Sequence, residues 1–224
     1  MSLPIAVLIS GSGSNLQSII EKMEDNILDV DIKVVLSNKA DAYGLKRAEA
    51  YGIPTAVLSH KDFGPREEFD AEMVRILKEA GVEAVVMAGF MRIITPVFLN
   101  AFPGKIVNIH PAILPSFPGV DGQGDAAKYG VQLAGCTAHF VDEKMDHGAV
   151  IIQAAVPAYP GEDEDELRER ILKQEHRILP QAVQWLAKDR LSVEGRFVKL
   201  AEADVDLAET DGLSLINPPL EVGF

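Results

Sequence analysis

Apolar runs alternate with amphipathic stretches along the first half of the chain. Continuous apolar runs predict buried strands at Pro4–Ser10, Asp31–Leu36, Pro54–Leu58, Glu83–Ala88 and Lys105–Val107. The stretches between them carry apolar residues at helical spacing, beginning near Leu16, Ala42 and Pro65. Strands that alternate with helices in this way predict an α/β fold that is Rossmann-like and doubly wound, with a mostly parallel sheet and helices on both faces.

The second half of the chain has a different pattern. Cys136–Val141 alternates between polar and apolar residues and predicts a strand with Thr137 and His139 on one side. A charged loop, Asp142–Gly148, separates it from another predicted strand, Ala149–Pro157. Two strands joined by so short a loop should pair antiparallel, which gives the sheet an antiparallel C-terminal portion.

A long helix and an acidic tail should complete the chain. Glu162–Asp165 places acids at the helix start, and Pro180 predicts a kink within the helix. From Ala201 onward the sequence has six acids and no Lys or Arg, which predicts a poorly packed tail. With no internal repeat and no clear linker, we expect a single domain over residues 1–200 and an acidic tail over residues 201–224.

Composition narrows the function classes. The 224 residues are 47% hydrophobic and 25% charged, as in ordinary globular proteins. Lys and Arg number 21 against 34 Asp and Glu, and this net charge of −13 disfavours binding to nucleic-acid phosphates. No leader peptide and no apolar run long enough to span a membrane is evident, so we expect a cytoplasmic protein. The single cysteine, Cys136, excludes an internal disulfide and a multi-cysteine metal site.

A glycine-containing turn, Gly11–Asn15, follows the first predicted strand. It precedes a predicted helix, and the backbone N–H groups of a first helical turn bind anions. The dinucleotide fingerprint needs a third glycine, where Leu16 stands, and an acid after the second strand, where Ser37–Lys39 stand. We therefore predict a site for a single phosphate, with a turn used only for packing as the alternative. Arg66 at a later helix start fits an anionic ligand or is a surface arginine.

Asn108 and His110 follow the fifth predicted strand and are separated by one residue. Alternate residues of a strand point to the same side, so both side chains should project into the crevice where open α/β sheets bind ligands. An amide beside an imidazole suits acyl transfer, because the amide stabilises an oxyanion and the imidazole gives or takes a proton. In the alternative interpretation, Asn108 ties down the following proline-rich loop and His110 packs beneath it.

The charged loop between the two antiparallel strands should leave the sheet near the same edge. A carboxylate there would hold the imidazole of His110 in one tautomer and favour its protonated form. Asp142, Glu143 and Asp146 all have the required chemistry, and their spacing does not choose among them. Two histidines and a carboxylate can bind zinc, but His110, His139 and Asp146 show no recurring ligand spacing, so no metal is expected.

Six segments carry a resemblance to a known family. They are LISGSGSN (Leu8–Asn15), SNKADAYGL (Ser37–Leu45), AGFMRI (Ala88–Ile93), VNIHPAILPSFPG (Val107–Gly119), GCTAHFV (Gly135–Val141) and QEHRILP (Gln174–Pro180). In this order they resemble the phosphoribosylglycinamide formyltransferases of the folate-dependent formyltransferase superfamily. AGFMRI and NIHP mark the superfamily, whereas GSGSNL together with SNKADA is typical of this family.

The resemblance implies transfer of the formyl group of 10-formyltetrahydrofolate to the amine of glycinamide ribonucleotide, a step of purine synthesis. Asn108, His110 and Asp146 resemble the family's catalytic residues: the first two would stabilise an oxyanion, and Asp146 would keep His110 protonated and assist proton transfer through water. The resemblance places the ribotide at Gly13, Ser14, Asn15 and Glu175, and the folate at Arg66, Met91, Arg92, Ile93, Ile94 and Asn108. It implies no metal, no nucleic-acid or membrane partner, and a monomer or homodimer.

Two segments depart from the family pattern. Val120–Gly124 replaces a Leu-His-Thr-type segment, so the contacts of that segment are not transferred, and Ala134 stands where some members have His. Related activities remain as alternatives. A methionyl-tRNA formyltransferase usually has a further C-terminal domain and binds tRNA, and a formyltetrahydrofolate hydrolase usually has an N-terminal regulatory domain; neither domain is expected here. The third alternative is a folate- or nucleotide-binding protein without turnover, against which the intact catalytic-type residues argue.

Overall fold

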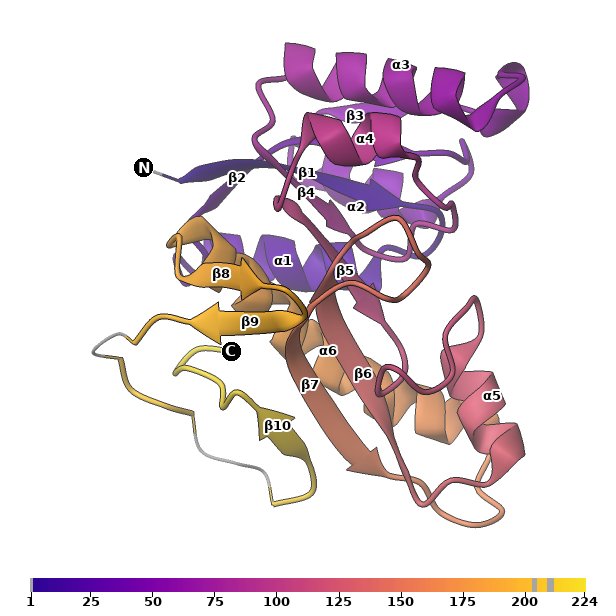
Figure 1. The fold of residues 1–224 in the computed structure, drawn as a ribbon, viewed down its shortest axis with the longest axis vertical. Coiled ribbons are helices and arrows are strands. Elements are labelled where there is room, and N and C mark those ends of the chain that lie inside the picture. The colour runs from indigo at the N-terminus through magenta and orange to yellow at the C-terminus, as the bar shows by residue number, and fades with distance from the viewer. Residues whose placement is uncertain (1, 203–204, 209–211) are drawn as a thin grey trace.

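The computed structural model describes residues 2–202, 205–208 and 212–224. Its main sheet contains β1 (Leu3–Ile9), β2 (Val30–Ser37), β3 (Thr55–Val57), β4 (Ala84–Met87), β5 (Ile106–His110), β6 (Leu133–Phe140), β7 (Val150–Pro157) and β10 (Leu215–Asn217). Within the described residues these strands form one eight-stranded sheet in the order β10-β7-β6-β5-β4-β1-β2-β3 (Figure 1). Strands β1 to β5 pair in parallel, and β6, β7 and β10 pair antiparallel. The predicted mostly parallel sheet with an antiparallel C-terminal portion is confirmed.

Helices cover both faces of the sheet. They are α1 (Ser14–Glu24), α2 (Tyr43–Ala50), α3 (Arg66–Glu79), α4 (Pro96–Ala101), α5 (Gly122–Tyr129) and α6 (Glu164–Ala187), with a short 3₁₀ turn at His60–Asp62. Residues of α1, α2, α5 and α6 share one buried cluster with the sheet, and residues of α3 and α4 share the other. In the described part of the chain, no helix is long and apolar enough to cross a lipid bilayer.

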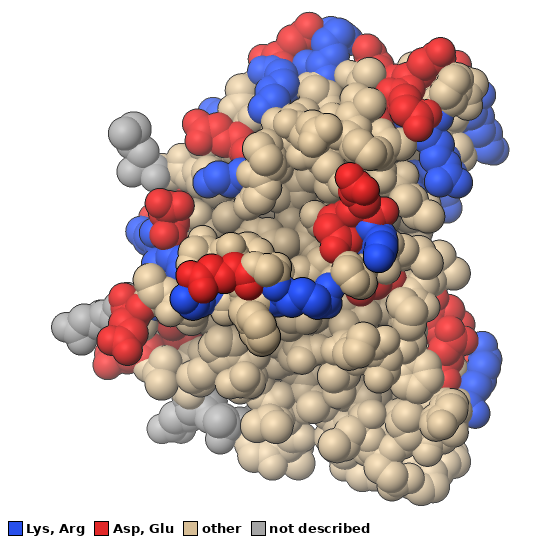
Figure 2. Space-filling model, viewed as in Figure 1, with Lys and Arg blue, Asp and Glu red and all other residues tan. Residues whose placement is uncertain are grey.

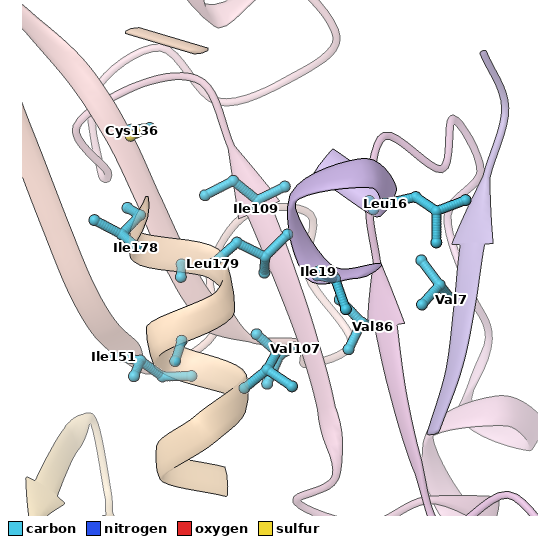
Figure 3. Packing of buried hydrophobic residues seen from close by; sticks show 14 of the residues in the cluster. Val7, Leu16, Ile19, Val86, Val107, Ile109, Cys136, Ile151, Ile178 and Leu179 are labelled. Carbon is cyan, nitrogen blue, oxygen red and sulfur yellow. The ribbon is translucent and has the colours of Figure 1, made fainter. Parts of the chain in front are cut away.

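The alternation of side chains along β5 decides which residues reach the site. Val107 and Ile109 point toward α1 and α6 and are buried in that cluster (Figure 3). Ile106 belongs to the cluster on the opposite face. Asn108 and His110, which lie an even number of residues from Ile106, therefore leave the strand on that opposite face. The prediction that these two side chains project together agrees with this geometry.

Three elements of the second half add to the expectations from the sequence. Helix α5 begins at Gly122, inside the segment Val120–Gly124 that departs from the family pattern. Helix α6 is one continuous element with Pro180 inside it, and the kink at Pro180 stays a prediction. A two-stranded hairpin, β8 (Leu191–Glu194) and β9 (Phe197–Leu200), was not predicted, since its strands are short and largely exposed.

Most described residues of the tail are exposed or half-buried, as the acidic sequence predicted, but two short parts of the tail pack against the domain; residues 203–204 and 209–211 lie outside the described residues. Strand β10 pairs antiparallel with β7. Leu220 and Glu221 are buried, and the Glu221 carboxylate accepts hydrogen bonds from Trp185 Nε1 at 2.9 Å and Arg190 Nη1 at 2.5 Å. These partners lie on or just after α6, so composition alone could not reveal them.

Candidate active site

A cavity of about 540 Å³ lies at the carboxyl ends of β1, β4 and β5. The strand order reverses between β1 and β4, which is where open α/β sheets bind ligands. Every predicted site residue except Gly13 lines it: Ser14, Asn15, Arg66, Met91, Arg92, Ile93, Ile94, Asn108, His110, Asp146 and Glu175. The fold thus brings together residues that are far apart in the sequence.

Gly13 has a packing role that the sequence left as an alternative. Its φ is +70°, in the left-handed region that favours glycine. A Cβ on Gly13 would lie 2.6 Å from the Cα of Gly44, at the start of α2, so the turn and α2 approach backbone to backbone. Arg47 Nε fixes the contact by donating to the Ser12 carbonyl at 3.0 Å. The first helical turn, with Ser14 lining the cavity, keeps its free N–H groups for an anion.

Asn15 and Glu175 form a buried pair at this end of the cavity. Asn15 Nδ2 donates to Glu175 Oε2 at 2.6 Å, which ties α1 to α6. Burial raises the pKa of Glu175, and the hydrogen bond from Asn15 lowers it in part. Asn15 Oδ1 is buried and has no hydrogen-bond partner among the described residues, so it is free to accept from a ligand.

Residues 89–94 form an apolar turn after β4 that lines another wall. Ser10 Oγ accepts from the backbone N–H of Met91 at 2.9 Å and donates to Asn38 Oδ1 at 2.6 Å. The carboxyl ends of β1 and β2 therefore hold this turn in place. Met91 and Ile93 are 56% and 48% exposed, which leaves apolar surface for a flat ligand.

Asn108 is oriented by a buried histidine. His139 lies opposite it in the β5–β6 register, and Asn108 Nδ2 is 3.1 Å from His139 Nε2. His139 Nδ1 donates to the Phe140 carbonyl at 2.7 Å, because a carbonyl only accepts. In the neutral ring Nε2 is then the acceptor, so the amide of Asn108 must donate to it. One N–H of that amide remains for the cavity.

The protonation of His139 predicts how the stability of the protein depends on pH. Burial lowers its pKa below the usual 6.5, although the Phe140 carbonyl and Asp146 act in the opposite direction. Between the lowered pKa and 6.5 the unfolded chain binds more protons than the folded chain, so this residue's contribution to the free energy of unfolding falls as pH decreases through that window. The slope from one such group is at most about 1.4 kcal/mol per pH unit.

We expect a His139→Gln variant, which keeps an acceptor for Asn108, to lose stability less steeply than the wild type between pH 7 and pH 5. Urea unfolding at a series of pH values measures this. His60 and His176, whose pKa values burial also lowers, are present in both proteins and cancel in the comparison. Equal slopes for the two proteins would show that His139 is not the neutral group inferred here.

His110 is held at both ring nitrogens. Nε2 donates to the Phe117 carbonyl at 2.8 Å, and Nδ1 lies 3.5 Å from Asp146 Oδ2. Asp146 also accepts from the backbone N–H of Gly119 at 2.8 Å. Nε2 therefore carries a hydrogen, and Nδ1 faces the Asp146 carboxylate and the cavity.

The structure distinguishes the three acids of the loop after β6. Asp146 faces His110 and is also 3.9 Å from His139. Asp142 instead pairs with His147 at 2.7 Å, and Glu143 is exposed. Within the described residues, no group of three His, Cys, Asp or Glu side chains has the geometry of a metal site.

The segment that departs from the family pattern lies against His110. Gly122, at the start of α5, is so close that a Cβ would lie 2.9 Å from His110 Nε2 and 3.0 Å from the Phe117 carbonyl oxygen. Glycine here therefore leaves room for the hydrogen bond that anchors the imidazole. Val120, in the same segment, lines the cavity and is 82% exposed.

Other lining residues were not predicted. Arg168 lies seven residues before Glu175 and Leu172 lies three before it, so all three share one face of α6. That helical spacing is a signal by which the sequence could have identified them. Lys144 and Met145, from the loop after β6, also line the cavity. Their placement depends on the path of that loop, which spacing does not predict.

Known proteins resemble this chain over most of its length. The formyl transferase family matches residues 3–183. The trifunctional purine biosynthetic protein adenosine-3 of Drosophila melanogaster is 49% identical over 184 residues, which cover 81% of this chain but only 14% of that much longer protein. The phosphoribosylglycinamide formyltransferase of Escherichia coli is 42% identical over 84% of this chain and 89% of its own length.

Solved structures agree with these relatives. The crystal structure of glycinamide ribonucleotide transformylase 1 from Symbiobacterium toebii superposes with a TM-score of 0.88 and 44% sequence identity, covering 90% of this chain and 95% of that one. The family match includes the turn at Ser14, the β5 residues Asn108 and His110, and Asp146. The chain therefore belongs to the formyl transferase family.

Proposed function

We propose that the protein transfers the formyl group of 10-formyltetrahydrofolate to the amine of glycinamide ribonucleotide, giving formylglycinamide ribonucleotide and tetrahydrofolate in purine synthesis. The observation that carries the proposal is the meeting of Asn108, His110 and Asp146 in one cavity, between an anion-binding helix start and an apolar turn. Phosphoribosylglycinamide formyltransferases among the relatives and solved structures support the choice of substrates.

The reaction begins when the ribotide amine attacks the formyl carbon, and the carbonyl π electrons move onto oxygen. The free N–H of Asn108 and the Nδ1–H of protonated His110 stabilise the oxyanion that forms. Collapse of the tetrahedral intermediate re-forms the carbonyl and breaks the bond to the folate nitrogen. Asp146 keeps His110 cationic and, through water, helps to move a proton from the attacking amine to the leaving nitrogen. These steps need no metal.

The two substrates occupy opposite ends of the cavity. The ribotide phosphate binds the first turn of α1 at Ser14 and Asn15, with Glu175 beside it. The folate ring system lies on the apolar turn of residues 91–94, and Arg66 at the exposed start of α3 faces the anionic glutamate tail. Arg92 Nε, which is buried without a partner among the described residues, is available to the same ligand.

Charge argues against a nucleic-acid substrate. Among the described residues on the face shown in Figure 2, Lys and Arg are interspersed with Asp and Glu and form no continuous basic surface. With a net charge of −13, this distribution offers little to neutralise a phosphate backbone. A small anionic ribotide is the better substrate for this cavity than a tRNA.

Replacing Asn15 with Leu is expected to weaken ribotide binding selectively. The variant loses the amide that bonds Glu175 and leaves that buried carboxyl unpaired at the phosphate end. We expect the KM for glycinamide ribonucleotide to rise roughly tenfold or more, with the KM for the folate little changed. Steady-state kinetics with each substrate varied in turn measures both. Gln17→Leu, on the same helix but outside this cavity, is the matched control, and equal losses for both substrates would contradict a phosphate site here.

The decisive experiment mixes purified protein with 10-formyltetrahydrofolate, with and without glycinamide ribonucleotide, and follows the folate by absorbance. Folate release that depends on the ribotide supports the transferase. Release without the ribotide would identify a hydrolase instead. Absence of release from a folded protein that still binds folate would leave the binding-protein alternative and reject the proposed reaction.

A further inference from the structure

The tip of the β8–β9 hairpin contacts the loop that carries Asp146 (Figure 1). Arg196, at this tip, donates from Nη1 to the backbone carbonyl of His147 at 2.8 Å. The same nitrogen lies 3.0 Å from His147 Nε2 and 3.2 Å from Nδ1, so the guanidinium also covers the imidazole. His147 directly follows Asp146, so the contact acts on the peptide next to the carboxylate that faces His110.

This loop has a backbone conformation that depends on its surroundings. Asp146 has φ = +51°, in the left-handed region that non-glycine residues adopt at an energetic cost. From the cavity side it is held by the N–H of Gly119 and by His110. On the outer side, His147 Nδ1 lies 2.7 Å from Asp142 Oδ2, and the other Asp142 oxygen accepts from the backbone N–H of Lys144 at 2.9 Å. The loop is thus closed on itself and held from outside by the hairpin.

The groups around Asp142 favour its charged form. Burial alone would raise the pKa of Asp142, but the hydrogen bonds from His147 and Lys144 lower it, with Arg196 adding attraction. Asp142 is therefore a carboxylate between two cationic or hydrogen-bond-donating partners. A single exposed ion pair contributes little to stability. Here the Arg196 guanidinium also donates a hydrogen bond to the backbone carbonyl of His147, so the contact holds the backbone of the loop.

We propose that Arg196 is a positioning residue for catalysis: by holding the backbone at His147 from the hairpin, it keeps Asp146 against His110. The hairpin then contributes to catalysis by positioning Asp146, although none of its residues lines the cavity. This inference rests on the proposed role of Asp146 in formyl transfer. It assigns to the sequence after α6 a function that the family match, which ends at residue 183, does not cover.

The test compares Arg196→Ala with Arg196→Lys and with a control on the same hairpin. Lys199→Ala removes the Lys199–Glu194 ion pair of the hairpin without touching the loop. We expect Arg196→Ala to lower kcat roughly three- to tenfold, with the KM for the ribotide unchanged, because Asp146 is displaced while the phosphate end is intact. Arg196→Lys, which can still donate to the carbonyl, should recover part of the loss, and Lys199→Ala should match the wild type.

A double-mutant comparison separates positioning from simple stabilisation. In an Asp146→Asn background, assayed at high enzyme concentration, adding Arg196→Ala should lower kcat less than twofold, since no carboxylate remains to be positioned. Equal fold losses in both backgrounds, or an Arg196→Ala variant with a lower Tm but normal kcat, would overturn the proposal. Wild-type protein is assayed first: its failure to transfer formyl groups would reject the proposed function, whereas active wild type with unchanged Arg196→Ala would reject only this inference.

Discussion

Substitution of Asp146 by Asn is expected to lower kcat by about 10²–10⁴-fold, the usual contribution of a positioned proton-transfer group. Asn has nearly the same shape, and its oxygen can still accept from the Gly119 N–H, so the loop should keep its path. What is lost is the negative charge 3.5 Å from His110 Nδ1. Without it the imidazolium is less favoured, and the intermediate loses both a donor and a proton carrier.

The measurement is steady-state turnover with both substrates saturating, together with the Tm of each variant. Glu143→Gln is the matched control, because it removes the same charge from an exposed position of the same loop. It should retain wild-type kcat. An Asp146→Asn protein with near-normal turnover would contradict the role of Asp146, and a variant with a greatly lowered Tm would require comparison with the more conservative Asp146→Glu.

Replacing Asn108 with Ala is expected to cost about 10²–10³-fold in kcat, the typical effect of losing one oxyanion donor. The amide stabilises charge that exists only after attack, so kcat should fall while both KM values change little. His139 sharpens the comparison, since it accepts the hydrogen bond that orients the amide.

His139→Ala keeps the Asn108 amide but lets it rotate, so its loss in kcat should be clearly smaller than that of Asn108→Ala. The two effects should not multiply in the double variant, because removing the amide leaves nothing for His139 to orient. If Asn108→Ala instead raised the KM for the folate at unchanged kcat, Asn108 would be a residue of folate binding alone. Kinetics of the three variants at saturating ribotide decide between these roles.

Much of the fold could be predicted from the sequence because its signals are local. Buried parallel strands appear as continuous apolar runs, and the alternation along β5 places Val107 and Ile109 on one face and Asn108 and His110 on the other. The glycine-containing turn Gly11–Asn15 likewise predicted a helix start that can bind an anion. The elements missed, such as the β8–β9 hairpin, are short and exposed, so their sequences carry little periodicity.

By itself, the sequence determined the α/β architecture and the placement of Asn108 and His110 on the same side of one strand. Its motifs also gave a family resemblance with which the family match agrees. Chemistry and spacing did not distinguish Asp146 from the other two acids of the loop, and the tertiary structure did. The orientation of Asp146 depends on its own left-handed backbone conformation and on the N–H of Gly119 from another loop. The burial of Glu221 and the contact of Arg196 with His147 also depend on partners distant in sequence. Spacing reports neighbours along the chain, and only packing decides which distant groups meet.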